Sequence, residues 1–118
     1  MNKIKSIFET KKRKVFIAYI VCGDPDIKTT LALMKVLAES GVDIIELGMP
    51  FTDPIADGPV IQKSVERSLM NNTSLKDVFS TVDLFKKTYP DVPVVLMGYL
   101  NPIENITYKK FSSLSKKN

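Results

Sequence analysis

Acidic side chains at the end of one apolar segment, and in the loop that follows it, are the residues best suited to chemistry. Glu46 stands between Ile45 and Leu47, and Asp53 and Asp57 follow in a loop rich in glycine and proline. Burial of an unpaired carboxylate in an apolar strand would raise its pKa, as a general acid or base near neutral pH requires. These residues therefore suggest acid–base chemistry carried by carboxylates.

Each of these carboxylates also has a purely structural interpretation. Glu46 could be satisfied by backbone N–H groups or lie on a solvated sheet edge, and the residues alone favour neither reading. Asp57 precedes Gly-Pro and could cap the helix that starts at Pro59. Asp53 lies in Thr-Asp-Pro and Asp24 in Gly-Asp-Pro, both of which are typical turn sequences.

Composition removes several other kinds of chemistry. The 118 residues contain no histidine and a single cysteine, Cys22, which we expect to be a small apolar residue at a strand end. Histidine-based catalysis, a disulfide within the chain and a metal site are therefore not expected. No apolar run is long enough to cross a membrane and the polar N-terminus is no secretory signal, so we expect a cytoplasmic protein.

Charge is distributed unevenly along the chain. Residues 1–14 and 109–118 hold ten of the seventeen lysine and arginine residues, whereas residues 15–108 carry seven basic and twelve acidic residues. No aromatic residues interleave the basic ends in the manner of a nucleic-acid surface. We therefore expect solvated, partly frayed termini and no nucleic-acid partner.

Three apolar strands alternate with helical segments. A continuous β-branched and aromatic run predicts a first strand buried on both faces, and Asp26 and Gly41 bound the helix after it. The second helix begins near Pro59, and a capping box at Ser74 and Asp77 opens the third, which Pro90 stops. The expected strands are 14–21, about 42–48 and 94–97.

The resulting order, β-α-β-α-α-β, predicts an α/β fold with a parallel sheet. Three parallel strands would leave an apolar edge, whereas a (β/α)8 TIM barrel closes its edges with about 250 residues. Phe111 and Leu114 also begin a helical stripe close to the end of the chain. We expect residues 1–118 to supply the first three βα units, the N-terminal part of a single barrel domain; a complete small α/β domain is the competing interpretation.

The segment from Glu46 to Pro59, Glu-Leu-Gly-Met-Pro-Phe-Thr-Asp-Pro-Ile-Ala-Asp-Gly-Pro, resembles without a gap the active-site segment of tryptophan synthase alpha chains. Gly23-Asp24-Pro25 and the run 96–103 support the resemblance more weakly. Carried over by position, Glu46 and Asp57 correspond to the two catalytic carboxylates of that family. If the resemblance holds, Tyr19 and Tyr99 could form walls for the indole ring.

The resemblance implies a carbon–carbon lyase of tryptophan biosynthesis. Its reaction is the retro-aldol cleavage of indole-3-glycerol phosphate to indole and glyceraldehyde 3-phosphate. It implies no cofactor in this chain, because pyridoxal phosphate belongs to the beta chain, and no metal. It also implies an alpha2beta2 heterotetramer, with the beta chain docking near residues 50–54 and the segment after Tyr99.

Two features leave alternatives open. Val21 and Cys22 depart from the residues common in the family, and barrels of this kind usually bind substrate phosphate on loops after strands seven and eight, outside this chain. We therefore expect no lyase activity from the 118 residues alone. The alternatives are a truncated, non-catalytic remnant that at most binds the beta chain, and another phosphate-handling TIM-barrel enzyme.

Overall fold

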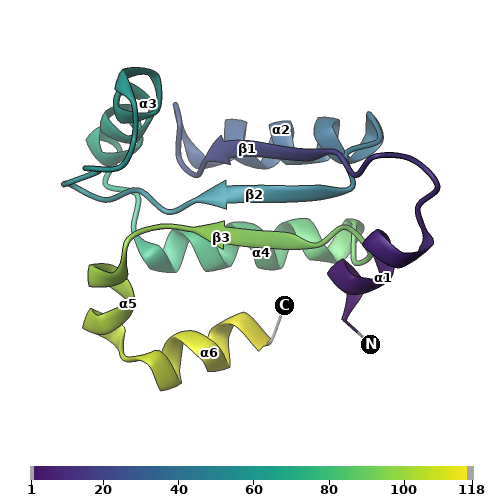
Figure 1. Cartoon of the computed structure of the whole chain (residues 1–118). Coiled ribbons are helices and arrows are strands. Elements are labelled where there is room, and N and C mark those ends of the chain that lie inside the picture. Colours follow the sequence, from purple (N-terminus) through teal and green to yellow (C-terminus); the bar gives the residue numbers. More distant parts are fainter. Residues whose placement is uncertain (1, 117–118) are drawn as a thin grey trace.

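A three-stranded parallel sheet forms the centre of the molecule (Figure 1). In the computed structural model, which describes residues 2–116, the strands β1 (Ile17–Val21), β2 (Ile44–Gly48) and β3 (Val94–Met97) lie in the order β1-β2-β3. Because the connections are helical crossovers, all three carboxyl ends lie at the same edge of the sheet. The expected α/β architecture and parallel pairing are confirmed.

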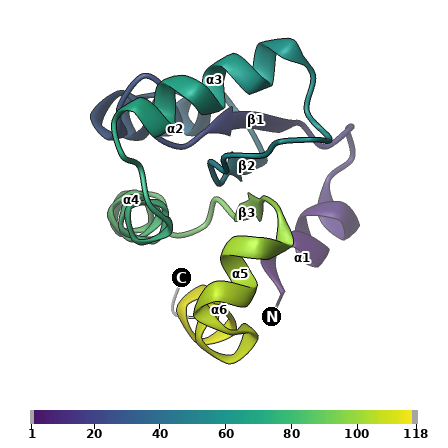
Figure 2. The same cartoon turned by 90° about the vertical axis from the view of Figure 1, so that its left-hand side faces the viewer.

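Two helices cover one face of this sheet. Figure 2, which looks along the strands, shows α2 and α4 together on one side of the sheet, with α1 farther back on the other side. Within residues 2–116, no helix is both long and apolar enough to cross a lipid bilayer. The helices are α1 (Lys3–Thr10), α2 (Ile27–Glu39), α3 (Pro59–Met70), α4 (Leu75–Thr88), α5 (Leu100–Ile106) and α6 (Tyr108–Lys116).

The helix boundaries follow from local sequence signals. The Asp26 side chain accepts a hydrogen bond from the N–H of Thr29 at 2.6 Å and begins α2. Gly41 follows the end of that helix with a φ of 91°, a conformation that favours glycine. Ser74 and Asp77 form the reciprocal capping box of α4. These predicted signals are confirmed, as is Pro59 at the start of α3.

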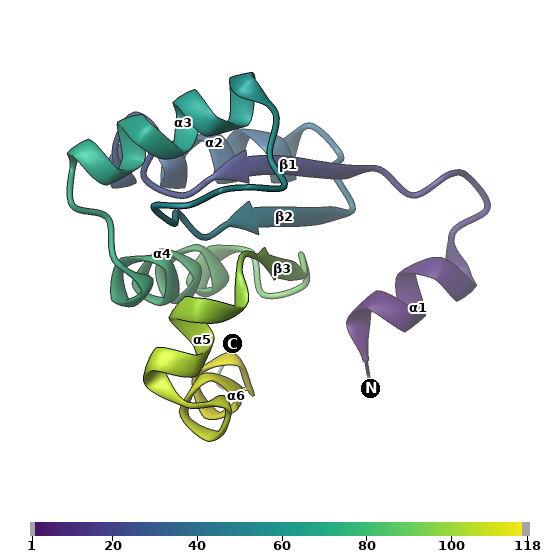
Figure 3. The ribbon, with the colours of Figure 1, turned by 60° about the vertical axis from the view of Figure 1, so that its left-hand side comes forward.

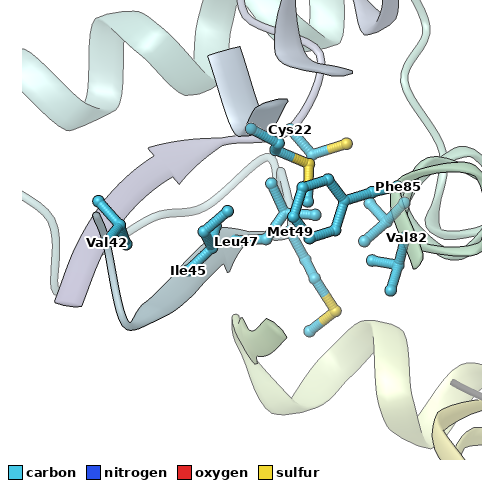
Figure 4. Packing of buried hydrophobic residues seen from close by; sticks show 9 residues of the cluster. Cys22, Val42, Ile45, Leu47, Met49, Val82 and Phe85 are labelled. Atoms are coloured by element: carbon cyan, nitrogen blue, oxygen red, sulfur yellow. The ribbon is translucent and has the colours of Figure 1, made fainter. Parts of the chain in front are cut away.

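The hydrophobic core lies between the sheet and its two covering helices. Ile45 and Leu47 are fully buried on the helical side of β2, where they pack with Val82 and Phe85 of α4 (Figure 4). Side chains alternate between the two faces of a strand, so the residues between and beside them project the other way. The core thus fixes which face of β2 remains open.

Strand β1 begins three residues later than predicted, at Ile17. The backbone leaves the strand conformation there because the N–H of Phe16 donates to the carboxylate of Asp43 at 2.9 Å instead of to a neighbouring strand. Nor is β1 buried on both faces, since Ile17 is 45% exposed. The prediction of a strand buried on both faces was wrong for β1, because α2 and α4 cover one face of the sheet and Ile17, like Tyr19, projects from the other.

The ends of the described chain are more ordered than the sequence suggested. Asn2 caps α1 by accepting from the N–H groups of Ile4 and Lys5. Helix α6 continues to Lys116, and residues 117–118 lie outside the described residues. Residues 3–10 and 108–116 are thus helical where the sequence suggested fraying, and neither helix contains a buried residue, as expected for solvated ends. Figure 3 shows α1 beside the amino ends of the strands, away from their carboxyl ends.

Candidate active site

Glu46 projects from the middle of β2 on the face that the helices leave open. In the register of the sheet it is aligned with Tyr19 of β1 and Val95 of β3. Its neighbours Ile45 and Leu47 belong to the core under the helices, so alternation directs Glu46 to the opposite face. The side chain is half-buried and forms no hydrogen bond or ion pair with any residue from 2 to 116.

The loop between β2 and α3 carries Asp57 beyond the carboxyl ends of the strands (Figure 1). Oδ2 of Asp57 accepts a hydrogen bond from the hydroxyl of Tyr99 at 3.0 Å. Gly58, not Asp57, is the N-cap residue of α3, and it forms no side-chain capping bond. The structural interpretation of Asp57 as a helix cap was wrong, because its carboxylate is turned toward β3 and not toward the helix.

Tyr99 follows β3 and contacts the same loop between β2 and α3. Besides its bond to Asp57, its hydroxyl accepts the N–H of Ala56 at 3.0 Å. Its ring lies 5.5 Å from that of Phe51, centroid to centroid, at an interplanar angle of 31°. The loop is therefore attached to the carboxyl end of the sheet by one tyrosine.

The hydroxyl of Tyr19 lies within the electrostatic field of both candidate carboxylates. Burial, followed by the negative charges of Asp57 and Glu46, raises the pKa of Tyr19 to about 12. The phenol ring lies over Gly48, where an added Cβ would stand 2.4 Å from the Tyr19 oxygen. Glycine at this position leaves room for the phenol ring at the end of β2.

Sequence reasoning missed a polar contact between the loop after β1 and helix α3. Asp24 accepts from Arg67 Nε at 2.7 Å and from Arg67 Nη2 at 2.9 Å, and also from the Ser64 hydroxyl. The Arg67 guanidinium and the Ser64 hydroxyl lower the pKa of Asp24. Because 43 residues separate Asp24 and Arg67, only the three-dimensional arrangement reveals the contact. It anchors α3, and with it the loop that carries Asp57.

Asp53 and Cys22 have contacts that indicate a structural role. Asp53 accepts the hydroxyl of its neighbour Thr52 at 3.0 Å in a turn. Cys22 is fully buried, and burial raises the pKa of its thiol to about 11, so it is an unreactive core residue. Residues 2–116 bring together no group of histidine, cysteine, aspartate and glutamate side chains that could hold a metal ion.

The candidate site is an open face of the sheet and not an enclosed cavity. A cleft of about 670 Å³ lies elsewhere, among α1, α4, β3 and α6, and contains neither candidate carboxylate. A smaller one of about 260 Å³ between β1 and α3 includes Tyr19 in its wall. The open face carries the half-buried carboxylate of Glu46, which has no hydrogen-bond partner among residues 2–116. Beside it lie the carboxylate of Asp57, which is bonded to a phenol, and the ring of Tyr19. This set suits proton transfer to and from an aromatic substrate.

The chain matches the family model of the tryptophan synthase alpha chain over residues 6–118. It is 56% identical over 114 residues to the tryptophan synthase alpha chain of Nitrosomonas europaea, covering 94% of this chain and 42% of that protein. It is 51% identical to the alpha chain of Neisseria meningitidis serogroup B, covering 99% and 45% respectively. The chain thus spans less than half the length of the curated relatives it matches.

Solved structures agree with this result. The crystal structure of tryptophan synthase subunit alpha from Legionella pneumophila str. Paris superposes with a TM-score of 0.96 at 44% identity, over 99% of this chain and 46% of that one. Tryptophan synthase from M. tuberculosis superposes with a TM-score of 0.91 at 29% identity. The three βα units correspond to part of the TIM barrels of these proteins, as the sequence predicted. The chain belongs to the tryptophan synthase alpha chain family.

Proposed function

We propose that residues 1–118 are the N-terminal part of a single TIM-barrel domain that cleaves indole-3-glycerol phosphate to indole and glyceraldehyde 3-phosphate. Glu46 and Asp57 are the proposed catalytic residues. Family membership supports the reaction class, a carbon–carbon lyase. The observation that carries the residue assignment is the unpartnered Glu46 on the open face, with its charge and that of Asp57 both acting on Tyr19.

The proposed reaction needs one proton donated and one removed. Glu46, as the acid, gives a proton to C3 of the indole, and positive charge develops on the ring. The glycerol hydroxyl then returns a proton to Glu46 as the bond from C3 to the glycerol carbon breaks. The electrons of that bond restore the neutral indole, and the hydroxyl-bearing carbon becomes the aldehyde.

Asp57 is proposed to stabilise the charged intermediate. A carboxylate near the indole N–H accepts its hydrogen bond and offsets the positive charge, a type of stabilisation that is strong where water is excluded. Tyr19 would lie against the indole as part of the wall of the site. No step needs a cofactor, and substrate phosphate would be bound by loops beyond residue 118, as in other barrels of this architecture.

The beta chain of tryptophan synthase is the proposed protein partner. The loop from 50 to 54 lies at the carboxyl ends of the strands next to Ile55, which is 89% exposed. With α3 it borders a hollow of about 320 Å³. Ile55 shares this hollow with Phe51, Pro54 and Leu69, and a contiguous exposed apolar surface is one that a partner would cover.

The test uses a completed chain, in which residues 1–118 are followed by the remaining residues of the Nitrosomonas europaea alpha chain. We expect this chain to release indole from indole-3-glycerol phosphate. Glu46→Gln should lower kcat by about 10³-fold and Asp57→Asn by about 10²-fold, the range of general acid–base and electrostatic contributions. The 118 residues alone should give no turnover.

Glu9→Gln is the matched control, because Glu9 lies exposed on α1, outside the candidate site, and its contact with Lys5 at 3.7 Å is a surface ion pair that contributes little to stability. Circular dichroism of each variant shows whether it is folded. A folded completed chain without turnover would contradict the proposed reaction. Full activity of Glu46→Gln would contradict the residue assignment.

A further inference from the structure

The hydroxyl of Tyr99 has a defined hydrogen-bonding direction. A phenol has one proton to donate and can accept in return. The N–H of Ala56 can only donate, so at 3.0 Å it uses the acceptor side of the Tyr99 oxygen. The single phenolic proton is then left for Oδ2 of Asp57, also at 3.0 Å. Tyr99 therefore donates to one particular oxygen of Asp57.

Asp57 is held at its backbone as well. Its N–H donates to the carbonyl of Pro54 at 3.1 Å, and its own carbonyl accepts the side-chain amide of Gln62 at 2.7 Å. These two bonds fix where the residue lies but leave its side-chain torsions undetermined. Within the described residues, the contact from Tyr99 is the one hydrogen bond that fixes the direction of the carboxylate.

We propose that Tyr99 is a positioning residue whose hydroxyl holds Oδ2 of Asp57, so that Oδ1 remains available to the N–H of the substrate ring. The proposal rests on the proposed lyase function and refines the role of Tyr99. The sequence suggested a wall for the indole, to which the ring face would contribute. In the structure the ring packs on Phe51, and the hydroxyl donates to Asp57.

Two substitutions of Tyr99 in the completed chain separate the two roles. Tyr99→Phe keeps the ring and removes the hydroxyl, and should lower kcat by about 30-fold with KM changed less than twofold, since small misplacements of a catalytic group are costly. Tyr99→Leu should lower kcat to a similar extent. A wall residue would behave differently: Tyr99→Phe would be nearly neutral, and Tyr99→Leu would mainly raise KM.

Tyr108→Phe is the matched control. Tyr108 lies exposed on α6, and its hydroxyl donates to Glu104 at 3.0 Å, so the same chemical change is made outside the site. Its kcat and KM should stay within twofold of the unsubstituted chain. If Tyr99→Phe were equally silent, the positioning role would be refuted even though the lyase reaction itself had been observed.

A double substitution tests whether Tyr99 acts through Asp57. Once Asp57→Asn has removed the carboxylate, adding Tyr99→Phe should lower kcat by no more than about twofold further, because residues that act as a unit are not additive. A further 30-fold loss would show that Tyr99 works independently of Asp57 and would overturn the proposal. Absence of turnover in the unsubstituted completed chain would instead refute the underlying lyase function.

Discussion

Two carboxylates lie three residues apart, Asp43 just before β2 and Glu46 in the middle of it, and their surroundings are opposite. Asp43 is satisfied on all sides: Lys11 contacts it at 2.8 Å, Arg13 binds both oxygens at 2.8 and 3.0 Å, and Phe16 donates its N–H. Glu46 has no such partner among residues 2–116 and faces the open side of the sheet. A satisfied carboxylate holds the chain together, whereas an unsatisfied one is available to a ligand.

The same contrast separates the two faces of β2. Leu47 and Ile45 are fully buried against the helices, and Glu46 between them is not. At the middle of this strand, alternation therefore places Leu47 in the core and Glu46 on the open face. Substitutions at neighbouring positions should then affect different measured quantities.

Leu47→Ala should have the largest effect on stability. Removing most of a fully buried side chain leaves a cavity between the sheet and α4, and such substitutions cost about 3 kcal/mol. Urea denaturation of the completed chain measures the loss. Below the unfolding transition, kcat should remain within about threefold of the unsubstituted chain. A loss of less than 1 kcal/mol would mean that the helical face is not the main source of stability.

Asp43→Asn should cost less, because its two cationic partners are partly exposed, Lys11 at 38% and Arg13 at 53%. The main effect of Asp43→Asn should be a changed pH dependence of the free energy of unfolding. The hydrogen bond from Lys11 and that from the N–H of Phe16, with Arg13 adding to both, hold the pKa of Asp43 well below its usual range. In the unfolded chain the pKa of an aspartate carboxyl is about 3.9.

The direction of the pH dependence follows because the folded pKa of Asp43 is lower than the unfolded pKa. Asp43 stabilises the folded chain fully above the unfolded pKa, and the contribution disappears as the pH falls toward the lower folded pKa, because the unfolded chain binds the proton first. The urea concentration at the unfolding midpoint should therefore decrease for the unsubstituted chain as the pH is lowered below about 4. For Asp43→Asn it should decrease less. Parallel curves for the two proteins would contradict the role of Asp43.

Gly48→Ala should act on the open face, with about a tenfold loss of kcat/KM. The new Cβ would stand 2.4 Å from the hydroxyl oxygen of Tyr19 and push its ring away from the site. Adding Tyr19→Phe should restore part of the activity, since the closest remaining contact is then 3.0 Å. Gly58→Ala is the control, because an added Cβ there meets nothing within 4 Å. Equal losses in both alanine variants would rule out displacement of Tyr19.

Much of the fold could be predicted because its signals are local. The capping box of α4, the proline that begins α3 and the β-branched run of β3 each lie within a few residues. Helix α5 was not predicted, because Pro102 lies near its start and proline usually interrupts a helix, although it is tolerated in the first turn. Helix α1 was missed because its charges concealed the Asn2 cap and an apolar stripe.

The site was less accessible to sequence reasoning. Glu46 stood out as a charged residue in an apolar strand, a local signal. The contact between Tyr99 and Asp57 joins residues 42 positions apart, and the contact between Arg67 and Asp24 joins residues 43 apart. Neither has a spacing that local periodicity could reveal, because both depend on where parallel strands place their carboxyl ends.

Glu46→Gln should have the smallest effect on stability. A small effect would distinguish Glu46 most clearly from Asp43. Glu46 contributes no hydrogen bond or ion pair to residues 2–116, so replacing the carboxylate with an amide of the same shape removes no described interaction. We expect the free energy of unfolding to change by no more than about 0.5 kcal/mol, as for substitutions away from structural contacts. Urea denaturation at neutral pH measures it beside Asp43→Asn. A loss of about 1.5 kcal/mol or more would mean that Glu46, like Asp43, is satisfied by the folded chain, since unpairing a buried acceptor costs that much. The structural interpretation of Glu46 would then replace the catalytic one.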